Sequence, residues 1–147
     1  MEAPLAMATA TELVQVQGAG AIIMVDDSFD DFYIADLMYA RCDLDNPFVH
    51  CESGDALMHY LDTLVDRVEE YPALILMDLN MPGLDGIETT ALLRSKPEFE
   101  HVPVIAMLTS SVDRQDRHRA ATAGADAYFS KPLNPTDYIE LFNSFAA

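Results

Sequence analysis

Short runs of apolar residues recur along the chain, and each is followed by polar or turn-forming residues. A strand that is buried on both faces reads as a continuous apolar run rather than as an alternation of apolar and polar positions. The pattern therefore predicts strands at 21–25, 48–51, 73–77, 102–108 and 125–129. The second run is less apolar than the others, as expected for a strand at the edge of a sheet.

Segments with apolar residues three and four positions apart lie between these runs, which is the spacing of one helix face. They predict helices at 29–40, 54–68, 87–94, 113–123 and 135–145. The first helix is expected to bury Phe29, Phe32, Tyr33, Leu37 and Ala40, and the second Leu57, Leu61, Leu64 and Val68. Ser28 and Asn134 can cap the first and last helices, and Gly124 ends the fourth. Strands that alternate with helices predict an α/β fold, a doubly wound parallel sheet with helices on both faces.

The length of 147 residues suits one domain. Residues 1–20 are rich in Ala and Thr and show no clear period, so they are expected to form a mobile N-terminal extension, or a short added helix, before a domain at 21–147. The longest apolar runs are too short to cross a bilayer.

The charge of the chain disfavours two classes of partner. Eight Lys and Arg against 25 Asp and Glu give a formal net charge of −17. Such a chain repels nucleic acid phosphates and anionic membrane surfaces, so no DNA or membrane partner is expected. The first residues lack the basic stretch of a secretory signal, and a cytoplasmic location is expected. Cys42 and Cys51 match no zinc spacing and are expected to be free thiols.

Chemically useful side chains follow four of the five predicted strands: the pair Asp26 and Asp27, then Asp78, Thr109 and Lys131. The carboxyl ends of parallel strands meet at one edge of a sheet, so these groups are expected to share a site. Clustered carboxylates repel one another and favour a bound cation, although a solvated acidic rim is the alternative. The four histidines, at 50, 59, 101 and 118, are expected away from this edge. Oxygen donors without His or Cys suit Mg²⁺ better than zinc.

The same strand ends suit phosphoryl transfer. The hydroxyl of Thr109 and the ammonium of Lys131 can both contact phosphoryl oxygens. Together with a metal ion they would neutralise the charge of a phosphoryl group in transfer. Asp78 would then be the nucleophile and would become an aspartyl phosphate.

In their order along the chain, these residues resemble the response-regulator receiver domain, of which the chemotaxis protein CheY is the minimal example. The matching marks are the acidic pair at 26–27, the segment DLNMPGLDG from Asp78, Thr109, Gly124-Ala125-Asp126 and Lys131-Pro132. The resemblance covers about residues 21–145. The chain also resembles, more weakly, the single-domain regulators that serve phytochrome-type histidine kinases.

The resemblance implies a flavodoxin-like strand order of 2-1-3-4-5. It also implies Mg²⁺, with Mn²⁺ as an alternative, bound by Asp27, Asp78 and the backbone carbonyl of Asn80, and by Asp26 through water. Lys131 would contact the phosphoryl group, with a cis peptide bond to Pro132.

A switch is implied at two further positions. Thr109 would move to bind the phosphoryl group, although Ser110 is an alternative for that role. Tyr128 matches the aromatic residue that swings inward with that hydroxyl, and a core aromatic is the alternative reading.

The implied function is a stand-alone signalling switch rather than an enzyme. Asp78 would accept the phosphoryl group from a histidine kinase or phosphotransfer protein, and output would pass to another, unidentified protein. A homodimer through the last strand and helices follows if the phytochrome-type resemblance holds. One rival is an Asp-nucleophile phosphatase of haloacid-dehalogenase type, but here the nucleophile follows the third strand and no cap is evident. Another is a phosphorylation-independent interaction module, which usually loses the Asp or Lys that this chain keeps at 78 and 131.

Overall fold

The computed structural model describes residues 14–111 and 113–146. Within them, five parallel strands form one sheet in the order β3-β2-β4-β5-β6. The strands are β2 (Ile22–Val25), β3 (Phe48–Cys51), β4 (Leu74–Met77), β5 (Ile105–Thr109) and β6 (Ala127–Ser130). Numbered along the chain, this is the predicted order 2-1-3-4-5, which is confirmed.

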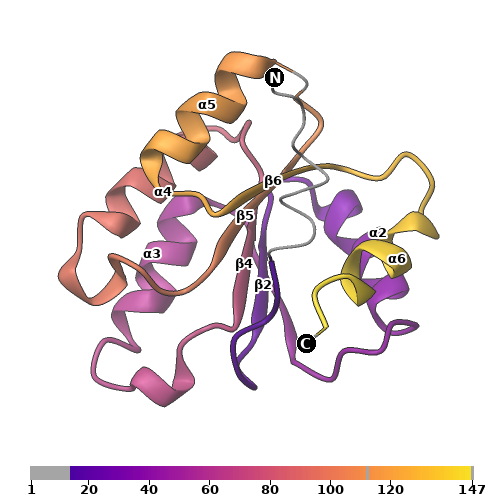
Figure 1. Ribbon diagram of the computed structural model, residues 1–147, viewed down its shortest axis with the longest axis horizontal. Coiled ribbons are helices and arrows are strands. Elements are labelled where there is room, and N and C mark those ends of the chain that lie inside the picture. Colours follow the sequence, from indigo (N-terminus) through magenta and orange to yellow (C-terminus); the bar gives the residue numbers. More distant parts are fainter. Residues whose placement is uncertain (1–13, 112, 147) are drawn as a thin grey trace.

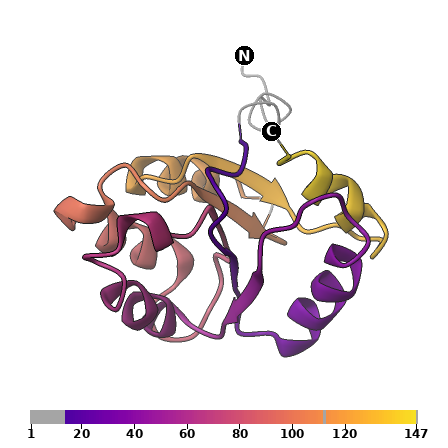
Figure 2. The ribbon, with the colours of Figure 1, turned by 90° about the horizontal axis from the view of Figure 1, so that it is seen from below.

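Helices cover both faces of the sheet (Figures 1 and 2). The described residues form α2 (Phe29–Tyr39), α3 (Gly54–Asp62), α4 (Gly86–Arg94), α5 (Arg114–Ala123) and α6 (Asp137–Asn143), with short 3₁₀ helices η1 (Val68–Glu70) and η2 (Pro97–Phe99). Helices α3, α4 and α5 lie on one face, and α2 and α6 lie on the other (Figure 1). None of the helices in the described part of the chain is long and apolar enough to cross a membrane.

Neighbouring residues of each strand pack into different cores. Ile75 and Met77 of β4 belong to the core under α3, α4 and α5, whereas Leu74 and Leu76 belong to the core under α2 and α6. All four side chains are fully buried. A strand in the middle of this sheet must be apolar at every position, which is why the sequence shows continuous runs there.

The predicted buried face of the first helix is wrong except at Phe32, which is half-buried against the core. Phe29, Tyr33 and Leu37 of α2 are 69%, 57% and 49% exposed, and the buried residues of the helix are Ala35 and Tyr39. Apolar residues occur on every side of this helix, so their spacing does not identify one face. Tertiary contacts select it, because the small Ala35 allows close approach to the sheet while the Tyr39 ring stacks on Phe48 at 4.5 Å.

Three predicted boundaries also differ. Helix α3 ends at Asp62, so Leu57 and Leu61 are buried as predicted but Val68 lies in η1 and is 66% exposed. Helix α6 begins at Asp137, with the predicted start at Asn134 forming a turn before it. Strand β5 begins at Ile105, because proline cannot donate to a sheet ladder and Pro103 therefore precedes the strand.

The last residues before β2 lie against the domain. Val14 is buried, and the Val16 N–H donates to the Phe145 carbonyl at 2.9 Å. The Asn46 side chain donates to the carbonyls of Gly18 and Gly20 at 3.0 and 2.7 Å. Residues 1–13 of the predicted mobile extension lie outside the described residues, and the domain boundary at 21 stays a prediction.

Candidate functional site

The four predicted strand ends lie at one edge of the sheet. Asp26 and Asp27 follow β2, Asp78 follows β4, Thr109 ends β5 and Lys131 follows β6. Val25 pairs with Met77 in the sheet register, which sets the residues that follow them side by side. One oxygen from each of the three aspartates lies within 4.8 Å of the others.

This carboxylate site is partly sealed from water. Asp26 and Asp78 are buried, whereas Asp27 is exposed. Burial is the main reason that the pKa of Asp78 is raised, and the charge of Asp26 raises it further. The charge of Lys131 and a hydrogen bond from the Thr109 side chain act in the opposite direction. The arrangement therefore favours a positive charge beside Asp78.

Lys131 supplies one such charge. Its Nζ lies 2.8 Å from Asp26 Oδ2, 2.8 Å from Asp31 Oδ2 and 3.4 Å from Asp78 Oδ2. Burial lowers the pKa of Lys131, but its contacts with Asp26 and Asp31 and the charge of Asp78 outweigh this and raise the pKa overall. The side chain is thus an ammonium ion throughout the neutral range, well placed to contact an anion on Asp78.

The donor set also fits a hard divalent cation. Asp26 Oδ2 is buried and, among the described residues, accepts no hydrogen bond of acceptable geometry, although Lys131 Nζ is close to it. A buried carboxylate oxygen with unused capacity, beside two more carboxylates, is what an oxygen-preferring ion such as Mg²⁺ or Mn²⁺ requires. Asn80 lies exposed in the loop after β4, and its predicted role as a carbonyl ligand stays a prediction.

The hydroxyl of Thr109, rather than that of Ser110, faces this site. Thr109 is fully buried, and its side chain lies close enough to Asp78 to lower the pKa of that carboxyl, whereas Ser110 is exposed. Thr109 Oγ1 also accepts the Ser111 N–H at 3.2 Å, and the Tyr128 hydroxyl donates to the Ser111 carbonyl at 3.3 Å. Ser111 therefore connects the strand-end hydroxyl to the buried Tyr128, whose ring lies 5.2 Å from the Arg117 guanidinium of α5.

Sequence reasoning missed two residues at the site. Asp31, in the first turn of α2, contacts Lys131, and nothing in its local sequence distinguishes it from the neighbouring Asp30. His50 was expected away from this edge, but its Nε2 lies 2.8 Å from the Asp26 carbonyl oxygen, and its ring stacks on Phe32 at 4.3 Å. Its position near the end of the second strand could have indicated this, because that strand pairs with the first strand, which Asp26 follows.

The predicted cis peptide bond between Lys131 and Pro132 is wrong. Within the described residues the cis bond is Val102–Pro103. The trans form of an X–Pro bond is favoured by only about 0.5–1 kcal/mol, so local packing selects the isomer.

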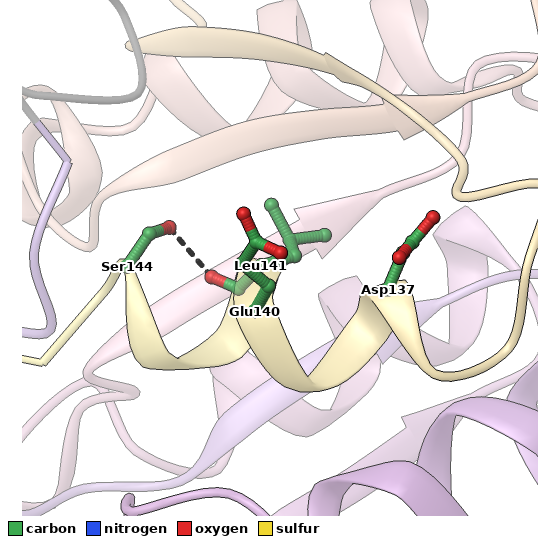
Figure 3. Close-up of a pocket in the computed structure, with 4 residues that line it drawn as sticks. All are labelled: Asp137, Glu140, Leu141 and Ser144. Atoms are coloured by element: carbon green, nitrogen blue, oxygen red, sulfur yellow. Dashed lines mark hydrogen bonds between the residues drawn. The ribbon is translucent and has the colours of Figure 1, made fainter.

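A pocket of about 370 Å³ on α6 is separate from the carboxylate site (Figure 3). It is lined by Asp137, Glu140, Leu141 and Ser144, and the Ser144 hydroxyl donates to the Leu141 carbonyl at 2.6 Å. Its two carboxylates would repel an anionic ligand, and none of the strand-end residues lines it.

Replacing the buried Asp78 carboxylate with a neutral amide should stabilise the metal-free protein. The raised pKa means that ionised Asp78 costs stability once the pH exceeds its unfolded-state pKa of about 4. We expect Asp78→Asn to raise the free energy of unfolding at pH 7 by on the order of 1 kcal/mol, with the difference shrinking as the pH falls toward 4. Urea unfolding with a chelator at several pH values measures this. A variant less stable than wild type at pH 7 would contradict the expectation.

Comparison of the sequence and of the structure with known proteins identifies one kind of domain. The family model described as "Response regulator receiver domain" matches residues 22–143. The polar-differentiation response regulator DivK of Brucella ovis is 39% identical over 77 residues, which are 52% of this chain and 62% of that protein. The chain thus spans 62% of the length of the curated relatives it matches.

Solved structures show the same fold. Response regulator RPA3017 in red light signaling of R. palustris is 30% identical, has a TM-score of 0.74, and is matched over 85% of this chain and 90% of its own. The Mn(2+)-bound form of response regulator Rcp1 is 25% identical, has a TM-score of 0.69, and is matched over 84% of this chain and 89% of its own.

Proposed function

We propose, because this chain belongs to the response regulator receiver domain family, that Asp78 accepts a phosphoryl group from a phosphohistidine of a histidine kinase or phosphotransfer protein. The observation that carries the proposal is the meeting of the buried Asp78 with Lys131, Thr109 and two further carboxylates. An Asp78 carboxylate oxygen would attack phosphorus, the P–N bond would break, and its electron pair would return to the imidazole ring.

Each residue of the site has a distinct part in this transfer. A divalent cation held by Asp26, Asp27 and Asp78 would supply positive charge to the phosphoryl oxygens. Lys131 would donate to one of those oxygens from its present place beside Asp78. The Thr109 hydroxyl, whose side chain already acts on the pKa of Asp78, would turn to donate to another.

Phosphorylation would then shift a surface that a second protein reads. A phosphoryl group adds about −1.5 to −2 charges beside Asp78. Because Thr109 connects through Ser111 to Tyr128, a new partner for the Thr109 hydroxyl would change the contacts that hold the Tyr128 ring near α5. The phosphoryl group can shift the equilibrium between two conformations of the domain only if it interacts more favourably with one of them. The chain is therefore a signalling switch whose output passes through another protein.

Incubation with a small acyl phosphate and Mg²⁺, followed by intact-mass measurement, tests the proposal. Wild type should gain the mass of one phosphoryl group and should gain none when a chelator replaces the metal. Absence of any gain with Mg²⁺ would overturn the phosphoacceptor role. Rapid turnover of phosphate esters would instead support the haloacid-dehalogenase-type phosphatase, which the similarity to response regulators such as DivK and RPA3017 disfavours.

The interaction-module alternative predicts something different. A phosphorylation-independent module would bind its partner equally with and without the phosphoryl group. The retained Asp78 and Lys131, which lie 3.4 Å apart, support a phosphorylation-dependent switch. Equal partner affinity before and after acyl phosphate treatment would favour the module.

The exposed face of α2 offers a docking surface for the phosphodonor. Phe29, Tyr33 and Leu37, which we call the α2 patch, follow one another at four-residue spacing and are all strongly exposed. The Phe29 ring stacks on His50 at 6.0 Å, and His50 Nε2 lies 2.8 Å from the Asp26 carbonyl oxygen, so the first residue of the α2 patch lies near the site. We propose that an apolar helix face of the donor, flanked by basic residues that complement the net charge of −17, packs against the α2 patch.

Loss of the α2 patch should impair transfer from a protein donor only. For a histidine kinase that phosphorylates wild type, Tyr33→Ala combined with Leu37→Ala should lower the transfer rate about tenfold, because two apolar contacts are lost. Uptake from a small acyl phosphate should stay unchanged. The matched control is Val68→Ala, which removes an equally exposed apolar side chain from η1. Equal slowing with both donors would show that the α2 patch is not a docking surface.

Location and oligomeric state stay proposals. A cytoplasmic location follows from the proposed exchange with a histidine kinase. The homodimer through the last strand and helices stays a prediction, and light scattering before and after acyl phosphate treatment would test it.

A further inference from the structure

Among residues 14–111 and 113–146, Asp31 is the one carboxylate in contact with Lys131 that does not belong to the three-carboxylate cluster. Its Oδ2 lies 2.8 Å from Lys131 Nζ, the same separation as that of Asp26 Oδ2. The Lys131 side chain is only 14% exposed, so the pair is not a contact between two freely solvated groups.

Hydrogen bonds fix the place of Asp31 relative to the site. The Ser28 N–H donates to Asp26 Oδ1 at 2.8 Å, and the Ser28 hydroxyl oxygen accepts the Asp31 N–H at 3.1 Å as the cap of α2. Lys131 then contacts both Asp31 and Asp26. The contacts form a closed ring of Asp26, Ser28, Asp31 and Lys131, so α2 begins with its acidic first turn held against the carboxylate cluster.

A bound cation would change the partners of Lys131. Asp26 and Asp78, its other carboxylate contacts, both belong to the cluster that fits a divalent ion. A dication there would repel the ammonium and would draw those two carboxylates to itself. Asp31 would remain as the carboxylate that keeps Lys131 beside Asp78.

We propose that Asp31 is a positioning residue that holds the Lys131 ammonium in reach of the phosphoryl group on Asp78. This inference rests on the proposed function of Asp78. It assigns to α2 a part in the chemistry that is separate from donor docking, because Asp31 acts through Lys131 and requires no contact with the donor protein.

The rate of phosphoryl uptake from a small acyl phosphate at fixed Mg²⁺ tests the proposal. Asp31→Asn should slow uptake about fivefold, because Lys131 loses its anchor. If only the overall charge mattered, Asp31→Asn would instead speed uptake, since removal of a negative charge weakens repulsion of the anionic acyl phosphate. Asp30→Asn removes the same charge from the neighbouring exposed position and should not slow uptake. Asp31→Glu should recover part of the loss.

A double-mutant cycle identifies the route of the effect. If Asp31 acts through Lys131, Asp31→Asn should cause no further slowing in a Lys131→Ala background. An undiminished effect in that background, or faster uptake in Asp31→Asn alone, would overturn the inference.

A metal-free measurement separates this inference from the proposed function. The chain has two lysines, Lys96 and Lys131, so Lys96 serves as an internal reference for acylation by an amine-reactive reagent. With a chelator present, Asp31→Asn should increase Lys131 acylation relative to Lys96 about two- to fivefold, because the amine gains access to solvent. An unchanged ratio means that Asp31 does not hold Lys131. If wild type takes up no phosphoryl group, the proposed function fails while this ratio still reports on the Asp31 contact.

Discussion

Asp78→Asn should abolish phosphoryl uptake. The amide lacks the anionic oxygen that attacks phosphorus, and it removes one of three carboxylates from the cluster that fits a cation. We expect the rate of uptake from an acyl phosphate in Mg²⁺ to fall by about 10³-fold or more, below detection by intact mass.

Two controls make this loss interpretable. Asp30→Asn should retain uptake, because that carboxylate is exposed and outside the cluster. Asp78→Asn should itself be folded and no less stable than wild type without metal, since the buried charge is removed. A phosphoryl group found on the folded Asp78→Asn protein would assign the acceptor to another residue.

Gly86→Ala should be the most destabilising single substitution near the site. A Cβ at Gly86 would overlap the carbonyl of Asp78 and would lie 2.9 Å from the Leu79 Cα, and backbone atoms cannot rotate away as a side chain can. The Gly86 N–H also donates to the Leu79 carbonyl at 2.8 Å, which fixes the approach. We expect a loss of about 3 kcal/mol in the free energy of unfolding by urea.

Gly83, in the loop before α4, is the matched control. Its φ of 74° disfavours a side chain, but a Cβ there would meet no atom within 4 Å. Gly83→Ala should therefore cost only about 1 kcal/mol, the price of the left-handed conformation. Equal stability losses in the two variants would show that backbone conformation, rather than overlap with Asp78, limits both positions.

Some site residues were readable from sequence because each follows a strand. Asp26, Asp78 and Lys131 each follow the end of a strand, and chain direction alone brings such positions to one edge of a parallel sheet. Asp31 and His50 were not readable in this way. Asp31 lies on a helix, and its contact with Lys131 joins residues 100 positions apart.

The sequence by itself determined the strands and the chemistry at their ends. It determined the strand order only through the resemblance to receiver domains. Buried parallel strands must be apolar throughout, and this requirement is visible in any single strand such as β4. The tertiary structure alone decided which face of α2 is exposed, that Thr109 rather than Ser110 points at Asp78, and that Asp31 holds Lys131. These features depend on which helix packs beside which strand, and the spacing of residues along the sequence does not determine that packing.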